Sequence, residues 1–383
     1  MKSLPNISRS FNVKFDYTLY FTENLFSLKN SLFFDIMNNY DKKNKIKTLF
    51  VIDNGVYNSH DKIKYEIKNY CSKFSNKIEL KKILIFKGGE IEKNNKNNFE
   101  KILKSINDEN ICRHSFIIVI GGGAIIDMVG YASTIAHRGV KLIRIPTTVL
   151  AQNDAAVGVK NSINEFGKKN FLGTFSPPHA IINDFNFLKT LDQRDWISGI
   201  AEAIKVALIK DSIFFDFIEK NSKLLSKRNK NKMSYLIYKC AEIHMNHITN
   251  GGDPFENGSS RPLDFGHWAA HKLEHLTNYK LRHGEAVAIG MALDITYSNM
   301  IGLLNQKDLT RILNVLEAIG FQIKIPIQTN VQIDNLLGGI QEFREHLGGK
   351  LTITLIKNIG TKIDVNKIDL KIMRNAITKL SGK

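Results

Sequence analysis

The architecture of this chain can be worked out from the run Phe116-Ile117-Ile118-Val119-Ile120-Gly121-Gly122-Gly123-Ala124-Ile125-Ile126-Asp127. Five consecutive apolar, mostly β-branched residues predict a strand that is buried on both faces. Three glycines at its end let the backbone approach a ligand closely, and the amide groups at the start of a following helix attract phosphate. The run therefore predicts a strand, a glycine turn and a helix that together hold a dinucleotide pyrophosphate. A tight turn without a ligand is the alternative.

Similar apolar runs at residues 48–53, 83–86 and 142–146 lie on either side of this strand in the sequence. Polar, helix-like segments separate them. Such alternation is typical of an open parallel α/β sheet, whose ligands bind beyond the carboxyl ends of the strands. Residues 3–20 fit either an edge strand or an arm. We therefore expect a Rossmann-like α/β domain over residues 1–183.

The second half of the chain is predicted to be mostly helical. Helical patterns and one late strand-like run follow residue 190: helices at 193–220, 231–250, 264–278, 284–303 and 307–319, and the strand at 351–356. The pair Pro177-Pro178 and the residues just after it mark the boundary between the two halves. A mostly α-helical domain over residues 184–383 is therefore expected.

Size and composition exclude several classes of protein. With 383 residues, of which 43% are hydrophobic, the chain can bury a large core in two domains. It has no run of about 18 apolar residues, so no membrane span is expected, and residues 1–15 lack the apolar segment of a signal peptide. Its three cysteines are far apart and odd in number, which argues against a disulfide framework. These features predict a cytoplasmic protein.

The net charge of +17 raises the question of nucleic-acid binding. The lysines are scattered among Asn and Ile, with only short runs such as residues 227–232. No element combines concentrated charge with aromatic or base-reading residues. We expect no nucleic-acid partner, although a positive field favours an anionic substrate.

A histidine-rich stretch at residues 264–285 predicts a metal site. His267, His271 and Glu274 are spaced i, i+4, i+7 and share one face of a helix, and His283 follows after a break. With His275, four of the chain's eleven histidines fall within this stretch. A catalytic zinc ion usually takes three protein ligands and keeps one open position, so a further ligand should come from elsewhere. The alternative is an amphipathic helix with histidines on its solvent side.

Other polar residues could hold a nucleotide or a phosphate. Asp53 directly follows a predicted strand, where it could accept hydrogen bonds from a ribose hydroxyl or simply stabilise a turn. Small residues around Asp154 and Lys160 suit a loop packed close to a ligand. Lys160, Lys169 and Asn170 could together hold a phosphate, unless these lysines are solvated loop residues.

Glu202 and Lys205 lie i, i+3 on a mostly apolar helix, so they project from one face. A glutamate among Ala and Ile needs a partner when it is buried. A surface ion pair would explain this spacing, but a carboxylate is also the type of ligand that the histidine stretch lacks.

Six motifs, taken together and in order, resemble the sugar phosphate cyclases, the superfamily of 3-dehydroquinate synthase. The resemblance covers about residues 45–300. The motifs are GGGAIIDMVG at 121–130, PTTVLAQNDAAVGVK at 146–160, KKNFLG at 168–173, GIAEAIK at 199–205, FGHWAAH at 265–271 and HGEAVAIG at 283–290.

The resemblance implies two cofactors and a set of site residues. A divalent metal, zinc or cobalt, would be held by Glu202, His267 and His283. NAD would be held by the residues Asp53, Glu90, Lys93, Gly121, Gly122, Gly123, Asp127, Thr147 and Thr148. The implied catalytic residues are Asp154, Lys160, Lys205, Glu256 and His271. Substrate contacts would come from Lys169, Asn170, Arg261 and Asp264.

The implied reaction uses a small-molecule sugar phosphate with seven carbons and causes no net redox change. A ring hydroxyl is transiently oxidised, phosphate leaves, the ketone is reduced again, and an intramolecular aldol step closes a carbocycle. His271 would relay a proton near pH 7, although a histidine that only supports the site would share its place. The resemblance also implies a homodimer.

Three departures from the dehydroquinate pattern bear on the substrate. That pattern has Arg at Ser260, Asn at Asp264 and Lys at Asn246. Because Arg is the natural clamp for a carboxylate, these changes favour a sugar phosphate without a carboxylate, such as sedoheptulose 7-phosphate. The 3-dehydroquinate synthase substrate, 3-deoxy-arabino-heptulosonate 7-phosphate, is the alternative, since Arg261 could take over if the loop shifts.

Two rival functions remain open. A metal-dependent polyol dehydrogenase would share the glycine turn and the histidine helices but would accumulate NADH. A binding protein that has lost catalysis would be expected to lose its metal ligands first.

Overall fold

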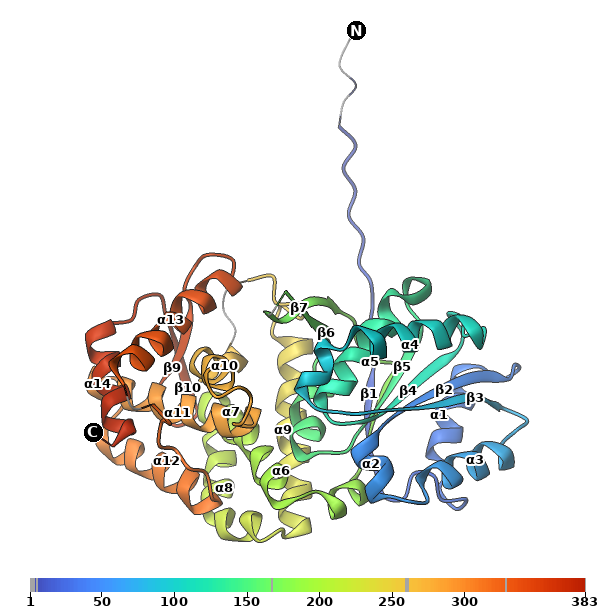
Figure 1. The fold of residues 1–383 in the computed structure, drawn as a ribbon, viewed down its shortest axis with the longest axis horizontal. Helices are drawn as coiled ribbons and strands as arrows, with labels where there is room; N and C mark the ends of the chain where they lie inside the picture. The colour runs from blue at the N-terminus through green and yellow to red at the C-terminus, as the bar shows by residue number, and fades with distance from the viewer. Residues whose placement is uncertain (1–3, 5, 167, 259–261, 328, 383) are drawn as a thin grey trace.

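The computed structural model describes residues 4, 6–166, 168–258, 262–327 and 329–382. Its N-terminal half contains a six-stranded parallel sheet with the strand order β1-β8-β5-β4-β2-β3 (Figure 1). The strands are β1 (Thr18–Thr22), β2 (Ile46–Asp53), β3 (Ile78–Phe86), β4 (Phe116–Gly121), β5 (Lys141–Pro146) and β8 (Ala180–Asp184). The four strands predicted from the sequence are all in this sheet, and the fold class is confirmed. The predicted boundary after residue 183 falls at the end of β8.

Both faces of the sheet are buried. Phe50, Ile118 and Ile143 belong to one apolar cluster, whereas their neighbours Val51 and Ile117 belong to the cluster on the other face. This is the period of two that a pleated strand imposes, and it explains why the strands are continuously apolar. The covering elements are α1 (Leu32–Tyr40), α2 (Asn54–Ser59), α3 (Ile63–Lys73), η1 (Glu90–Asn94), α4 (Lys96–Asp108), α5 (Gly123–Ile135) and η2 (Ala136–Arg138).

The segment between β5 and β8 leaves the sheet. After β5 the chain forms a single π-helical stretch, η3 (Ala151–Ala155), and then an antiparallel hairpin of β6 (Lys160–Glu165) and β7 (Lys168–Phe175). This region was expected to be a loop. Single π-helical turns are frequently found at functional sites, so this stretch is a candidate for one.

The C-terminal half is mostly helical, as predicted, and its elements lie on the opposite side of the molecule from the sheet (Figure 1). Its helices are η4 (Phe185–Thr190), α6 (Gln193–Ser198), α7 (Ile200–Lys210), α8 (Ser212–Ser226), α9 (Lys230–Asn250), η5 (Pro262–Asp264), α10 (His267–Leu276), α11 (His283–Met300), α12 (Gln306–Ile319), α13 (Asn330–His346) and α14 (Leu370–Ser381). The predicted strand at 351–356 corresponds to β9 (Ile353–Asn358), which pairs with β10 (Thr361–Val365).

The helix predicted over residues 193–220 is wrong in one respect, because it is three helices. Gly199 separates α6 from α7, and a Cβ at this position would lie 2.3 Å from the Leu150 nitrogen. Asp211 separates α7 from α8 and accepts a hydrogen bond from the Phe214 amide as the N-cap. The two breaks let α7 enter the core as a separate, almost wholly buried helix.

The N-terminal segment turns out to be both an arm and an edge strand. Residues 18–22 form β1 at the edge of the sheet, next to β8. The described residues before Phe15 extend away from the body of the molecule (Figure 1), and Ile7 and Phe11 are highly exposed. Within the described part of the chain, no helix combines the length and the apolar character needed to cross a membrane.

Candidate active site

The three predicted metal ligands come together between α7, α10 and α11. One ligand atom from each of Glu202, His267 and His283 lies within 4.8 Å of the others. The Glu202 Oε1 atom is 3.8 Å from His267 Nε2 and 3.5 Å from His283 Nε2. Each histidine is the first residue of its helix, so the short segments before α10 and α11 bring the two rings to one point.

The chemistry of this cluster fits a divalent cation. The Glu202 side chain has no exposed surface, and neither carboxylate oxygen has a hydrogen-bond partner among the described residues, although Lys205 Nζ lies against Oε2. Burial raises the pKa of Glu202, but Lys205 and the nearby histidines lower it by more, so the carboxylate is charged. His267 Nδ1 lies 3.0 Å from the Phe265 carbonyl oxygen, which can only accept a hydrogen bond. The Nε2 lone pair of His267 is thereby left for a metal.

A second set of possible ligands, His271, Glu274 and His283, overlaps with the first. The Glu274 carboxylate is already occupied, because Lys169 Nζ donates to both of its oxygens at 3.1 and 3.2 Å. His283 Nδ1 also lies 3.2 Å from Glu274 Oε2. We therefore assign Glu274 to orienting His283, so that Nε2 of His283 faces Glu202. The sequence placed Glu274 on the correct helix face but gave it no role.

His271 and His275 differ as the sequence suggested. The rings of His271 and His283 are stacked with centroids 5.9 Å apart, whereas His275 is exposed. Burial, together with the charge of Lys169, holds the pKa of His271 well below its usual range. His271 is therefore neutral at pH 7, and its lowered pKa makes it a weaker base than a free imidazole.

The predicted cofactor residues lie at the carboxyl ends of the parallel strands. Asp53 ends β2 and accepts a hydrogen bond from the Gly55 amide at 2.7 Å as the N-cap of α2. A Cβ at Gly121 would lie 2.9 Å from the Asp53 Cβ, so only glycine fits this strand end without a shift. Gly122 is the N-cap of α5, and no side chain caps the first amides of that helix, which begins at Gly123. Uncapped amides at a helix start suit a pyrophosphate, so the residues present fit NAD.

The other cofactor candidates surround this edge. The Thr147 amide donates to the Gly121 carbonyl at 3.0 Å, and the Thr148 hydroxyl accepts from the Ala151 amide at 3.1 Å. Glu90 lies in η1, which follows β3, and its Oε1 accepts from Asn164 Nδ2 at 3.2 Å.

Lys93 is a buried lysine whose hydrogen bonds link two elements of the structure. Its side chain is 1% exposed, and Nζ donates to Asp127 Oδ2 at 2.9 Å and to Ser162 Oγ at 3.2 Å. It also contacts Asn170 Oδ1. Lys93 thus joins α5 to the β6–β7 hairpin, and Asn170 is part of the same network.

The substrate-facing candidates pair with one another. Lys160 Nζ lies 2.7 Å from Glu256 Oε2, and the lysine side chain is half exposed, so its charge is accessible. Glu256 has a φ of 51°, a conformation that costs energy for a residue with a side chain. The Asp253 carboxylate fixes this loop by accepting from the amides of Asn257 and Gly258 at 2.8 and 2.7 Å.

An aromatic cluster that sequence reasoning missed supports the same loop. Phe255, next to Glu256, stacks on Phe175 of β7 with ring centroids 5.6 Å apart. Phe15 of the N-terminal arm packs edge-on against Phe255 at 5.9 Å. The arm and the hairpin therefore both contact the loop that carries Glu256.

The charges of Asp154, Lys205 and Asp264 lie close enough to influence one another. Burial raises the pKa of each carboxyl, but nearby positive charges lower it by more, chiefly Lys205 for Asp154 and Lys160 for Asp264. Both carboxylates are therefore ionised at neutral pH. The carboxylates Glu202 and Asp154 outweigh burial and raise the pKa of Lys205, so its ammonium stays charged.

Two positions that depart from the dehydroquinate pattern, Ser260 and Asn246, can be compared with the structure. Arg261 and Ser260 lie outside the described residues. Asn246 is exposed on α9, whereas His244 is the buried residue on that part of the helix. A lysine missing at position 246 is therefore weak evidence about the charge of the site.

Arg144 is a further residue that the motifs did not reveal. It is fully buried in β5, and its guanidinium donates to the carbonyls of Ala156 and Lys160 at 2.9 and 3.2 Å and to Asn161 Oδ1 at 2.7 Å. It also donates to the Gly158 carbonyl. A charge inside an apolar strand run was the signal, because such a residue must have buried partners.

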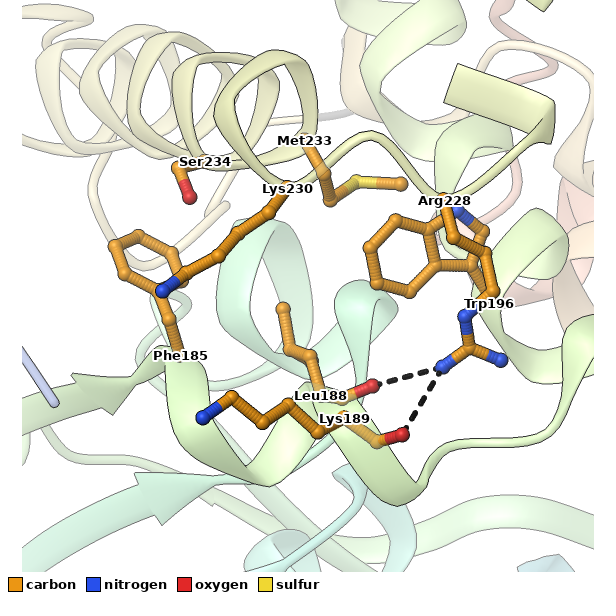
Figure 2. A pocket seen from close by; sticks show the side chains of 8 residues that line it. All are labelled: Phe185, Leu188, Lys189, Trp196, Arg228, Lys230, Met233 and Ser234. Atoms are coloured by element: carbon orange, nitrogen blue, oxygen red, sulfur yellow. Dashed lines mark hydrogen bonds between the residues drawn. The ribbon is translucent and has the colours of Figure 1, made fainter. Parts of the chain in front are cut away.

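A pocket of about 240 Å³ lies apart from these residues, where η4 meets α6 and α9 (Figure 2). Two of the cations that line it, Arg228 and Lys230, already have partners. Arg228 donates to the carbonyls of Leu191 and Leu188 at 2.6 and 3.0 Å and lies over the Trp196 ring, and Lys230 pairs with Glu23 at 2.7 Å. The pocket contains none of the predicted site residues.

Comparison with known proteins identifies relatives of the whole chain. Residues 83–198 match the family model described as 3-dehydroquinate synthase N-terminal, and residues 199–343 match 3-dehydroquinate synthase C-terminal. The 3-dehydroquinate synthase of Buchnera aphidicola subsp. Baizongia pistaciae is 32% identical over 362 residues, covering 94% of this chain and 97% of that protein. The Thermodesulfovibrio yellowstonii enzyme of the same name is 35% identical over 267 residues, or 69% of this chain and 73% of that protein.

Solved structures give a similar result. The 2-epi-5-epi-valiolone synthase ValA from Streptomyces hygroscopicus subsp. jinggangensis 5008, with NAD⁺ and Zn²⁺ bound, superposes with a TM-score of 0.87 at 26% identity, covering 98% of this chain and 99% of that one. A 2-deoxy-scyllo-inosose synthase complexed with carbaglucose-6-phosphate, NAD⁺ and Co²⁺ has a TM-score of 0.77 at 22% identity, over 94% and 96% of the two chains, and shows the shared fold.

Proposed function

Because the chain belongs to the 3-dehydroquinate synthase family, in the sugar phosphate cyclase superfamily, we propose that it eliminates phosphate from a seven-carbon sugar phosphate and closes a carbocycle. The family makes it a carbon–oxygen lyase acting on phosphates. The substrate that we favour carries no carboxylate and resembles sedoheptulose 7-phosphate.

Two cofactors complete the proposed site. The glycine turn at residues 121–123 and the first amides of α5 would hold NAD, and Glu202, His267 and His283 would hold zinc or cobalt. Bound NAD⁺ supplies reversible hydride transfer, and the metal supplies Lewis-acid polarisation of an oxygen atom.

The chain's own residues would handle phosphate and protons. Lys160 presents an accessible ammonium that can hold the dianionic phosphate, and Glu256 keeps this ammonium in place through their ion pair. The His271 ring, 5.5 Å from that of His267, lies where it would exchange a proton with a substrate beside the metal cluster. Lys169, tied to Glu274, links the hairpin to the metal side of the site.

The negative charge of Asp264 is the observation on which the proposed substrate rests. Its carboxylate lies in the field of the site residues Lys160, His267, His271 and Lys205. The negative charge of Asp264 repels a carboxylate on the substrate. Its oxygens can instead accept hydrogen bonds from the hydroxyl groups of a substrate that is uncharged at this end.

A phosphate-release assay tests this proposal. The enzyme, loaded with NAD⁺ and zinc or cobalt, would be given sedoheptulose 7-phosphate or 3-deoxy-arabino-heptulosonate 7-phosphate. We expect a higher kcat/KM for sedoheptulose 7-phosphate, and Asp264→Asn should narrow this difference because it removes the repelling charge. Phosphate release from the carboxylate-bearing sugar alone would contradict the proposed substrate.

3-Dehydroquinate synthase activity is the second candidate, because the relatives at 32–35% identity carry that name. The same assay identifies it. Glycerol dehydrogenases also share the fold, at 15–17% identity. Sustained NADH accumulation with a polyol, without phosphate release, would exclude both cyclase candidates.

A further inference from the structure

His244 of α9 is a buried, titratable residue that neither the motifs nor the family resemblance included. It is 8% exposed, and its Nδ1 lies 3.0 Å from Asp154 Oδ1. This close contact lacks the alignment of a hydrogen bond, and the described residues give Nδ1 no hydrogen-bond partner. The imidazole therefore faces one of the proposed catalytic carboxylates.

The direction of His244 is specific to its place on α9. Asn246 is exposed, and the Nδ1 atom of His247 lies 3.3 Å from Lys210 Nζ instead of facing Asp154. The other edge of the His244 ring lies along Gly158, where an added Cβ would come within 3.7 Å of the ring carbon Cε1. This distance is an ordinary van der Waals contact, so the ring lies directly against the π-helical stretch that carries Asp154.

Asp154 is held on its backbone but needs a partner to hold its side chain. Its carbonyl accepts from the amides of Val157 and Gly158 at 3.0 and 3.1 Å. Its carboxylate interacts electrostatically with Lys205 and also meets His244. Without the imidazole, Oδ1 would lose its polar neighbour and the carboxylate could rotate toward Lys205.

We propose that His244 is a positioning residue of the active site, whose Nδ1–H group attracts Asp154 Oδ1 and fixes the direction of this carboxylate. The inference rests on the proposed cyclase function, in which Asp154 faces the substrate. A carboxylate can only accept, so the contact requires the proton on Nδ1. The other oxygen of Asp154 is then held ready to exchange a proton with a substrate hydroxyl.

Substitutions at position 244 test this role. His244→Leu removes the donor but keeps an apolar side chain of similar bulk, and His244→Asn keeps an amide donor close to the position of Nδ1. With sedoheptulose 7-phosphate, we expect His244→Leu to lower kcat by about 10- to 100-fold, the usual effect of losing a residue that orients a site group. The KM should change little, and His244→Asn should recover most of kcat. His247→Leu, on the same helix, is the matched control and should keep the parent's kcat.

A double-mutant cycle with Asp154→Asn separates this role from a general loss of structure. If His244 acts through Asp154, His244→Leu should add almost nothing to the loss of kcat in Asp154→Asn. The inference would be overturned if the kcat losses of His244→Leu and Asp154→Asn multiplied fully in the double mutant. It would also be overturned if His244→Leu kept the parent's kcat, or if His244→Asn lost as much kcat as His244→Leu. If His244→Leu does not fold, the His244→Asn variant and its double mutant with Asp154→Asn give the same comparison.

A substrate-free measurement keeps this test independent of the proposed function. In ¹⁵N-histidine NMR spectra of the full chain, the signal assigned to His244 should show a protonated Nδ1 that shifts in Asp154→Asn. If the parent releases no phosphate from any sugar but this signal behaves as expected, the proposed function fails and the contact stands. If the parent is active and the signal does not respond to Asp154→Asn, the contact is absent and the inference fails.

Discussion

Arg144 in β5 and Glu202 in α7 both carry a charge with no exposed surface, but their surroundings are opposite. The Arg144 guanidinium donates to three main-chain carbonyls and to the Asn161 side chain. The Glu202 carboxylate faces Lys205 and two imidazoles, and neither of its oxygens has a hydrogen-bond partner among the described residues. Both terminal nitrogens of Arg144 have partners that hold residues 156–161 in place, whereas its Nε atom has none among the described residues. Glu202 has the surroundings expected of a metal ligand before the metal binds.

Removing the Arg144 guanidinium should have the largest effect on stability. Arg144→Leu leaves four buried acceptors without their donor, and we expect a loss of about 3–5 kcal/mol in the free energy of unfolding. Urea denaturation of the metal-free protein measures this loss. Arg374→Leu, which removes an exposed ion pair with Asp334, is the control and should cost less than about 1 kcal/mol. A loss in Arg144→Leu no larger than in the control would contradict the structural role.

Changing Glu202, whose carboxylate also pairs with Lys205, should lower the affinity for the metal. Glu202→Gln keeps the shape but weakens the ligand, so we expect zinc affinity to fall by more than about 100-fold, beyond the effect of an outer partner. Zinc should raise the Tm of the parent and leave the Tm of this variant almost unchanged. Glu242→Gln, an exposed residue paired with Lys239, should behave like the parent. Equal zinc affinity in both variants would show that Glu202 is not a ligand.

A substitution at Glu274 tests whether this carboxylate supports metal binding indirectly, by orienting the proposed metal ligand His283. Glu274→Gln replaces one of the two acceptor oxygens by a donor amide and removes the charge that pairs with Lys169, so His283 is oriented less firmly and zinc affinity should fall by about 10- to 100-fold. Calorimetric titration with zinc measures this change. A larger loss than in Glu202→Gln would instead favour the overlapping set with His271 and Glu274 as ligands.

Arg228 provides a half-buried counterpart to the fully buried Arg144, and its replacement should have the smallest effect. Like Arg144, it donates to main-chain carbonyls, but it is only half-buried and lies beside the pocket drawn in Figure 2. Water can replace part of its hydrogen bonds, so Arg228→Lys should reduce the free energy of unfolding by only about 1 kcal/mol. A loss as large as in Arg144→Leu would show that burial does not explain the difference between the two arginines.

Local patterns carried most of the fold prediction. Continuous apolar runs separated by helical segments indicated a parallel sheet because both faces of such a sheet must be covered. The spacing of His267 and His271 fixed their common helix face, and the glycine turn fixed the edge at which a dinucleotide would lie. The errors, such as one helix in place of α6, α7 and α8, occurred where Gly199 packs against a distant backbone, which a local pattern does not record.

The site divides in the same way. Its histidines, its glycine turn and its buried glutamate could be recognised along the sequence, because each depends on spacing within one or two elements. The partners of Arg144, the contact of His244 with Asp154, the bridge from Lys169 through Glu274 to His283, and the support of Glu256 by Phe15 and Phe175 join residues far apart in the chain. The sequence by itself determined the elements and the chemical groups at their ends. Only the tertiary structure decided which charges are satisfied and which are left for a ligand, because burial and partners depend on the packing of separate elements.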